Sequence, residues 1–407
     1  MSDSLVLNDS RRGRGSNTVF VIIIALLLVN VGATVFLFAY TNRYVSNLSD
    51  LTVRNSLLQN QISSLNQEIE SLKSQLAVQK YLNASESMLL PQIYNQTMFS
   101  VVLITVKTPQ GSAQGSGFVY DQKGHILTNN HVVDKATAIE VTFIDGTIAS
   151  AALVGTDPYS DLAVVRVSVD FSLLYPLSLG SSSDLVVGET VIAIGNPYGL
   201  SNSMTVGIVC QLGRELSASG GYLIVDVIQT DAAINKGNSG GPMLNLRGEV
   251  VGMNTAILTM TGEWQGIGFA IPSDTIKREV LSLITKGSYD HAYMGVTGIE
   301  MTPDIAEAMD LPNNTRGALV VEVVRGGPSD GKLMGGNREV TVDGSKIKVG
   351  GDVLIGADGY TMKSFYDIIL YLERNKRPGD SVTFNVIRGK QLTTVTIKLG
   401  TRPPPSS

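Results

Sequence analysis

A glycine-rich segment around Ser239 could expose a nucleophile. Residues 231–242 read DAAINKGNSGGP, in which glycines and a proline surround a single serine. Such segments are most often tight turns between strands. A serine hydroxyl becomes a good nucleophile only when a base takes its proton and an acid orients that base. Ser239 is therefore a candidate nucleophile only if the rest of the chain supplies both partners.

Histidine is the side chain best suited to be that base, because its ordinary pKa lies near neutrality. The chain has 3 histidines. His125 stands beside a turn, which predicts a surface residue, and His291 lies in a short junction at 288–293. His131 follows LTNN at the end of an expected strand, which makes it the best candidate. A structural role is the alternative for each of them.

The acid must be a carboxylate that orients the imidazole and stabilises its charged form. Asp161 is the best candidate, because it directly precedes the apolar strand LAVVRV, where a carboxylate could be partly buried. Asp157, in the same loop, is the second candidate. Asp134, Asp145 and Asp231 have the surroundings of turn residues.

Composition argues against other kinds of site. The chain has 407 residues and a net charge of −5, and its only cluster of basic residues is Arg11–Arg14, so nucleic acid is not expected as a main partner. The single cysteine, Cys210, allows no intrachain disulfide or cysteine-based zinc site, and we expect a buried thiol. Residues 326–332 imitate a phosphate-binding loop, but Leu333 stands where a hydroxyl is needed. We expect no metal and no cofactor.

Residues 18–40 are apolar and uncharged. About 20 helical residues span a bilayer, and the segment exceeds the roughly 7–15 apolar residues of a signal peptide. We therefore predict an uncleaved transmembrane helix. Arginines precede it at positions 11, 12 and 14, and only Arg43 follows closely, which places residues 1–17 in the cytoplasm and the rest outside the cell membrane.

Residues 44–80 are polar apart from an apolar seven-residue repeat, which predicts a parallel coiled coil; an amphipathic helix packed on another surface is the alternative. The isoleucines and leucines, with Asn55 in the isoleucine register, favour a coiled coil of two helices. The repeat consists of Leu51, Leu58, Leu65 and Leu72, with Ile62, Ile69 and Leu76 between them.

Short apolar strands separated by turn residues fill the chain from about 99 to 272, which predicts barrels or a sandwich. Residues 273–287 then predict a helix, capped by Ser273 and ended by Gly287. We place a domain boundary there.

Residues 288–400 predict a second globular unit. It contains a helix from Ser364 to about Asn375 and a C-terminal hairpin with alternating apolar residues. Residues 401–407 predict a loose tail.

A series of segments occurs in one order along residues 90–400, and together they resemble the high-temperature-requirement (HtrA, or Deg) family of membrane-anchored serine proteases. The resemblance implies a mostly β fold, with a chymotrypsin-like double β-barrel protease domain at 88–287 and one PDZ domain at 288–400. The segments are QGSGFVYDQKGHILTNNHVV, TDPYSDLAVVRV, AIGNPYG, LIVDVIQTDAAIN, GNSGGPMLN and QGIGFAIP.

The resemblance implies that His131 is the general base, Asp161 its orienting acid and Ser239 the nucleophile. Backbone N–H groups of Gly237 and Ser239, with Asn238 between them, would form an oxyanion hole. A glycine at 237 lets the backbone aim its N–H inward.

Residues before the nucleophile and a downstream segment would form the primary specificity pocket. No acid lies among them, so we expect the pocket to accept medium aliphatic side chains such as valine rather than lysine or arginine. The residues are Ala233, Ile234, Met253, Asn254 and Thr255.

The segment AYMGV resembles the PDZ loop that binds a peptide C-terminus. Tyr293, Met294, Gly295 and Val296 would hold the terminal carboxylate while the peptide adds a strand to a sheet edge. Residues 326–352 are longer than the family pattern, so the ligand preference stays open.

The resemblance thus implies an ATP-independent serine endopeptidase that acts on misfolded or unfolded extracytoplasmic proteins and binds peptide C-termini. The alternative is a non-catalytic or chaperone-type peptide-binding membrane scaffold. A homo-oligomer is expected: the family works as trimers, whereas the coiled-coil pattern favours dimers.

Overall fold

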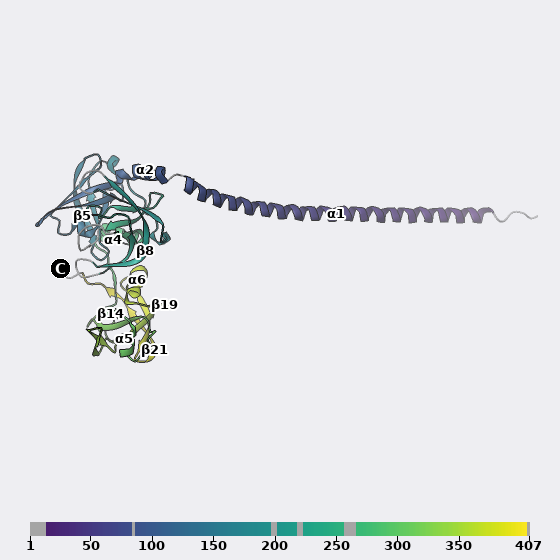
Figure 1. Cartoon of the computed structure of the whole chain (residues 1–407). Helices are drawn as coiled ribbons and strands as arrows, with labels where there is room; N and C mark the ends of the chain where they lie inside the picture. The colour runs from purple at the N-terminus through teal and green to yellow at the C-terminus, as the bar shows by residue number, and fades with distance from the viewer. Residues whose placement is uncertain (1–13, 84–85, 197–201, 218–222, 256–265, 405–407) are drawn as a thin grey trace, which may run out of the picture. The chain divides into compact units, whose positions relative to one another are not determined.

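The computed structural model describes residues 14–83, 86–196, 202–217, 223–255 and 266–404. The chain divides into two compact units, residues 1–86 and 87–407 (Figure 1). The first unit is dominated by one helix, and the second holds the strands that the sequence predicted.

Helix α1 (Arg14–Asn83) runs unbroken through the predicted transmembrane and coiled-coil segments (Figure 1). Its part Val21–Tyr44 is long and apolar enough to cross a membrane, by length and composition. In the second half, the heptad residues Leu51, Leu58 and Ile62 are exposed. The helix therefore presents apolar side chains to its surroundings along both segments, while the coiled coil itself stays a prediction.

Two closed barrels follow α2 (Glu86–Thr97) and settle the choice between barrels and a sandwich. The first barrel has the strand order β1-β2-β3-β6-β5-β4, and Ile104, Ile126 and Val165 fill its interior. Its strands are β1 (Val101–Thr108), β2 (Gly111–Val119), β3 (His125–Thr128), β4 (Ala138–Thr142), β5 (Ile148–Asp157) and β6 (Leu162–Val167), with η1 (Met98–Ser100) before β1 and α3 (Asn130–Val133) after β3.

The second barrel has the order β10-β11-β12-β9-β8-β7. Val191, Ile228 and Met243 are buried within it. Cys210, expected to be buried, is only partly buried on strand β8. The elements are η2 (Phe171–Leu173), η3 (Ser182–Asp184), β7 (Thr190–Gly195), β8 (Ser203–Ser217), β9 (Leu223–Thr230), β10 (Pro242–Leu244), β11 (Val250–Thr255) and β12 (Gly268–Pro272).

Helix α4 (Ser273–Lys286) closes the protease-like part, as its apolar periodicity predicted. Ile276, Val280 and Leu283 are buried against the barrel core. Gly287 ends the helix with a φ of +81°, a conformation that glycine adopts without steric cost. The predicted cap is wrong: Pro272 is the capping residue, and the hydroxyl of Ser273 donates to the carbonyl of Gly180 instead.

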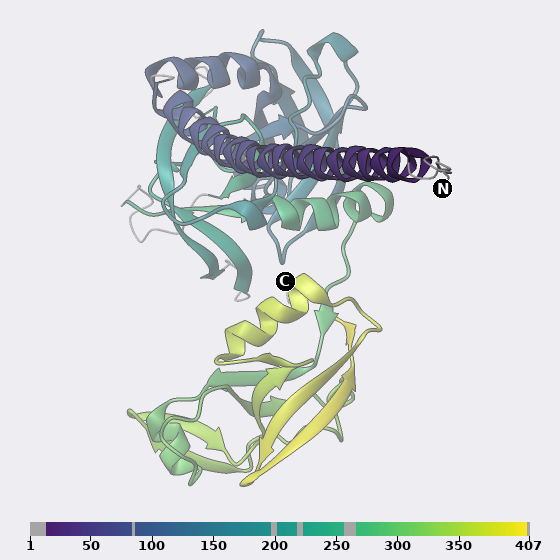
Figure 2. The same ribbon diagram turned by 90° about the vertical axis from the view of Figure 1, so that its right-hand side faces the viewer.

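A second sheet, ordered β14-β15-β18-β20-β21, packs with helix α6 (Phe365–Asn375) around Phe384, Ile368 and Leu372 (Figure 2). Strand β14 lies at its edge. The elements are β13 (Ala292–Tyr293), β14 (Val296–Glu300), α5 (Pro303–Ala308), β15 (Ala318–Val323), β16 (Arg338–Val342), β17 (Ser345–Val349), β18 (Val353–Ala357), β19 (Tyr360–Thr361), β20 (Ser381–Arg388), β21 (Gln391–Lys398) and β22 (Gly400–Thr401).

Two segments differ from expectation. The long segment 326–352 contains the two-stranded sheet β16–β17, joined at Asp343 and Gly344, both of positive φ. Thr401, placed in a loose tail by the sequence, instead pairs with Ala292 in β22. The chain end therefore returns to the start of this domain.

We predict that Ser364→Ala lowers the free energy of unfolding of the domain formed by residues 288–400 by about 1 kcal/mol, because it removes a helix cap. Ser364 and Asp367 form a capping box at the start of α6. Urea denaturation followed by the domain's own transition measures the change. Ser345→Ala, at an exposed hairpin position, is the control. Equal effects of the two substitutions would contradict the prediction.

Candidate active site

Asp161 is held by both barrels at the point where β6 begins. It is 4% exposed, and its backbone has a φ of +54°, which is rare for a residue with a Cβ. The backbone N–H groups of Asn130 and His131 donate to its carbonyl and carboxylate at 3.1 and 3.0 Å. From the second barrel, the hydroxyl of Thr255 donates to the same carboxylate at 2.9 Å. The carboxylate is thus fixed from several sides.

His131, on α3, presents its ring to this carboxylate. Nδ1 lies 2.8 Å from Oδ2 and 3.0 Å from Oδ1 of Asp161. Burial lowers the pKa of His131, but the charge and hydrogen bond of Asp161 outweigh that effect and raise the pKa above its ordinary value. Because Nδ1 donates to the carboxylate, the neutral ring keeps its lone pair on Nε2. The His131 side chain is about half exposed (47%), so Nε2 can serve as a base toward a bound molecule.

Ser239 lies between β9 and β10, on a loop that packs against the first barrel. Its carbonyl accepts from the backbone N–H of Ser116 at 2.7 Å, and the hydroxyl of Ser116 donates to the carbonyl of Gly237 at 2.6 Å. At Gly240 a Cβ would stand 2.1 Å from the Ser116 carbonyl and 3.2 Å from the backbone nitrogen of Asn129. Only glycine allows this close approach. It brings the Ser239 loop next to the end of β3, which is followed by α3 and His131.

Gly237 has a φ of +103°, which a residue with a Cβ rarely adopts. Its neighbour Asn238 is buried, and the backbone N–H of Asn238 donates to Asn235 at 2.9 Å. The loop is therefore a turn of fixed shape, while the oxyanion hole formed by Gly237 and Ser239 stays a prediction.

The predicted pocket residues separate into two groups. Ala233 is half-buried and Ile234 is buried in a small cluster beside the Ser239 loop. Met253 instead lies in the barrel core, and Asn254 donates to the carbonyls of Ile194 and Pro242. Both side chains thus stabilise the protein interior, and a pocket wall formed by this segment stays a prediction. The predicted wall segment GMNTA (252–256) ends at residue 256, which is outside the described residues.

Thr255 was also assigned to the pocket wall, but it donates to Asp161. Sequence reasoning missed this contact, since nothing in the order of segments indicates that β11 ends opposite Asp161. Ser116, which orders the Ser239 loop, was missed for the same reason: only the closed barrels bring it there.

The other two histidines lie elsewhere. His125 is buried, and its Nδ1 lies 2.7 Å from Asp121, so the surface prediction is wrong: the turn folds Asp121 back over it. His291 contacts Asp157, the second candidate acid, at 2.7 Å. Asp157 therefore does not face His131.

The predicted peptide-binding residues begin the second domain. Met294 is buried, and its carbonyl accepts from the hydroxyl of Ser329 at 2.6 Å. Gly295 has a φ of +73°, and Tyr293 and Val296 lie on β13 and β14. Edge strand β14 contacts α6 at Gly298, where a Cβ would stand 2.5 Å from the Phe365 ring. An edge strand beside a helix is therefore available next to the predicted loop.

Two family models match this chain. A trypsin-like peptidase domain matches residues 115–253, and a PDZ domain matches residues 293–399. The first match contains His131, Asp161 and Ser239, and the second begins at Tyr293.

Among curated relatives, the chain is 40% identical over 302 residues to "Protease Do-like 1, chloroplastic" of Arabidopsis thaliana, covering 74% of this chain and 66% of that protein. It is 39% identical over 294 residues to a "Probable periplasmic serine endoprotease DegP-like" of Brucella suis, covering 72% and 53%. This chain thus spans about half to two thirds of the length of these relatives.

Solved structures agree. The HtrA-type protease AlgW with a tripeptide superposes with a TM-score of 0.64 at 34% identity, covering 77% of this chain and 97% of that one. A serine endoprotease from Yersinia pestis gives a TM-score of 0.56 at 30% identity, covering 77% and 98%. The trypsin-like domain, the PDZ domain and these neighbours show that the chain belongs to the HtrA (Deg) family of serine proteases, with one PDZ domain.

Proposed function

We propose that this chain is an ATP-independent serine endopeptidase in which Ser239, His131 and Asp161 act as nucleophile, general base and orienting acid. The observation that carries the proposal is the contact of His131 Nδ1 with the buried Asp161 carboxylate at 2.8 Å, beside the loop that holds Ser239. A triad needs a base whose ring is oriented by a fixed acid.

In the proposed reaction, Ser239 Oγ attacks the carbonyl carbon of the scissile bond as His131 Nε2 takes the hydroxyl proton. The negative charge that develops on the carbonyl oxygen is stabilised by the N–H groups of Gly237 and Ser239. His131 then gives the proton to the leaving amine, and the acyl group stays on Ser239. Water, deprotonated by His131, then attacks the acyl carbon, the bond to Ser239 Oγ breaks, and His131 returns the proton to Ser239 as the acid product leaves.

Asp161 favours this sequence because its charge stabilises the imidazolium that forms in each half of the reaction. Its partner Thr255 keeps the carboxylate from rotating away. Such an oriented acid matters greatly: an amide in its place typically lowers kcat by about 10⁴-fold.

The proposed substrates are unfolded polypeptides, with peptide C-termini held by Tyr293, Met294, Gly295 and Val296. Edge strand β14, beside α6, is available for an added peptide strand. The apolar part of α1 supports a membrane anchor at 18–40. The arginines that precede it support a catalytic domain outside the cell, and the exposed heptad residues support a homo-oligomer.

We predict that a fluorophosphonate labels the intact protein and that Ser239→Ala abolishes the label. The rate of labelling should rise with pH as His131 loses its proton, with a midpoint above the ordinary histidine value because Asp161 raises the pKa of His131. Gel fluorescence and mass spectrometry locate the label. Ser183→Ala, at an exposed serine, is the control.

Labelling that persists in Ser239→Ala, or an unlabelled wild-type protein, would contradict the enzymatic proposal. The second result would favour a peptide-binding scaffold.

We predict that cleavage follows medium aliphatic residues. The pocket residues Ala233 and Ile234 carry no charge, so a lysine or arginine side chain would lose its hydration without gaining a partner. A panel of peptides that differ only at the residue before the scissile bond should show cleavage after valine at least about tenfold faster than after arginine. Faster cleavage after arginine would refute this assignment.

We predict that the PDZ domain of the Ser239→Ala protein binds apolar-ended peptides through their free carboxylate. Replacing the C-terminal carboxylate by an amide removes the charge that the backbone N–H groups would bind, and should weaken binding about tenfold or more. Fluorescence anisotropy with paired peptides measures the ratio. Equal affinities for acid and amide would rule out terminal-carboxylate recognition.

A further inference from the structure

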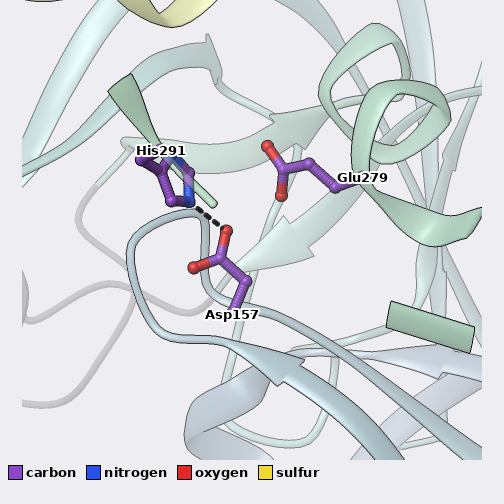
Figure 3. Close-up of side chains that lie close together, drawn as sticks. All are labelled: Asp157, Glu279 and His291. Carbon is purple, nitrogen blue, oxygen red and sulfur yellow. Dashed lines mark hydrogen bonds and ion pairs between the residues drawn. The ribbon is translucent and has the colours of Figure 1, made fainter. Parts of the chain in front are cut away.

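A buried cluster of titratable side chains lies away from the triad, where the PDZ domain joins the protease domain. Asp157 ends strand β5, Glu279 lies on α4, and His291 lies just before β13 (Figure 3). Their exposures are 2%, 0% and 4%. Glu373, on α6 of the PDZ domain, completes the cluster.

His291 is placed between two carboxylates. Nε2 lies 2.7 Å from Asp157 Oδ2, and Nδ1 lies 3.0 Å from Glu373 Oε2. A carboxylate accepts but does not donate when ionised, so both ring nitrogens donate and the ring is an imidazolium. Burial lowers the pKa of His291, but its hydrogen bonds to Asp157 and Glu373 prevail and raise the pKa to about 10.

Glu279 carries a proton by a similar argument. The Ser160 hydroxyl lies 2.6 Å from Asp157 Oδ2 and 2.5 Å from Glu279 Oε2. It has one proton to donate, so a second proton must come from one of the carboxyl groups. Burial and the charge of Asp157 raise the pKa of Glu279 to about 8, which identifies Glu279 as the donor. The ionised Asp157 and Glu373 then balance the charges of His291 and Arg278.

A metal ion fits this geometry less well than protons do. Ligand atoms of one zinc ion at about 2.0–2.2 Å in a tetrahedron would stand roughly 3.3 Å apart. The contacts of Asp157 with His291 and Ser160 are 2.7 and 2.6 Å, the distances of hydrogen bonds.

The cluster is joined to the triad by one short turn. Asp157 Oδ1 accepts from the backbone N–H of Tyr159 at 3.0 Å, and the N–H of Asp161 donates to Pro158 at 3.3 Å. Asp161, whose φ is positive, is the last residue of this turn. The same turn is held by the chain end, because the Tyr159 hydroxyl donates to the Pro403 carbonyl at 2.5 Å and Arg402 lies 3.7 Å from the Tyr159 ring centroid.

We propose that His291, together with protonated Glu279, is a positioning residue for Asp161: it holds Asp157 and the turn 158–161, so that Asp161 stays oriented toward His131 while the cluster is protonated. The inference rests on the proposed function. It makes the alkaline side of the activity profile a property of this junction rather than of His131.

The direction follows from the raised pKa values. A group whose folded pKa is raised contributes stability that is complete below its unfolded pKa and is lost as pH rises through the folded pKa. The junction should therefore weaken as pH passes about 8 for Glu279 and about 10 for His291. The titratable and charged groups that face His291 or Glu279 are Asp157, Tyr159, Arg278, Tyr289 and Glu373, with Arg377 and Arg402 stacked on the two tyrosines.

The test is the rate of fluorophosphonate labelling of Ser239 in the full chain, from about pH 6 to about pH 10. In Glu279→Gln the side chain at position 279 is neutral at every pH. The pH at which the labelling rate falls should therefore move from near 8 toward 10. His291→Gln cannot donate to both carboxylates and should slow labelling by roughly 10- to 100-fold at neutral pH. His125→Gln is the matched control, because His125 forms a buried pair with Asp121 at the same 2.7 Å and lies outside the junction.

The outcomes separate the two proposals. A wild-type protein that is not labelled at Ser239 refutes the proposed function itself. If labelling depends on Ser239 but its rate falls at the same alkaline pH in wild type, Glu279→Gln and His125→Gln, only the positioning role is overturned. A lower melting temperature in His291→Gln without slower labelling indicates a purely structural role and also overturns it. Loss of labelling in EDTA that zinc restores would overturn the protonated cluster in favour of a metal site.

Discussion

The buried carboxylate of Asp161 is the contact on which the rest of the site depends. An ionised group with 4% exposure is costly unless hydrogen bonds replace its hydration. Here the His131 ring, the His131 backbone N–H and the Thr255 hydroxyl supply them. Since these donors come from both barrels, the barrels must close against one another before the carboxylate is stable. The same requirement fixes the distance between α3 and the Ser239 loop.

The glycines of that loop serve this closure. Gly240 allows the loop to approach Ser116 and the end of β3, and Gly237 permits the left-handed backbone beside Ser239. Ser116 links the two features, because its backbone donates to Ser239 and its side chain to Gly237. The position of Ser239, the shape of its loop and the contact between the barrels therefore depend on one packed arrangement.

Residues of the PDZ domain contact the protease domain away from His131 and Ser239. His291 and Glu373 contact the protease domain through Asp157 and Arg278, and Arg374 pairs with Asp226 on strand β9. A buried ionic junction is not a strong source of stability in itself, because desolvation offsets much of the attraction. The junction does favour this one arrangement of its partners, since removing one of them leaves a buried charge uncompensated. Such a junction suits the coupling of two domains better than it suits their permanent attachment.

Much of this molecule was readable from the chain. Hydrophobic periodicity predicted α4, α6 and the helix through residues 18–80, and the order of segments identified the family and placed His131, Asp161 and Ser239. These features are local or depend on linear order, so sequence alone determined them. The sequence did not reveal the contacts of three residues. Thr255 contacts the other barrel, His125 lies beneath a turn, and His291 lies between domains. His291 meets residues 134 and 82 positions away. Only the closure of the barrels and the docking of the PDZ domain bring those groups within hydrogen-bond distance, and burial then sets their charge.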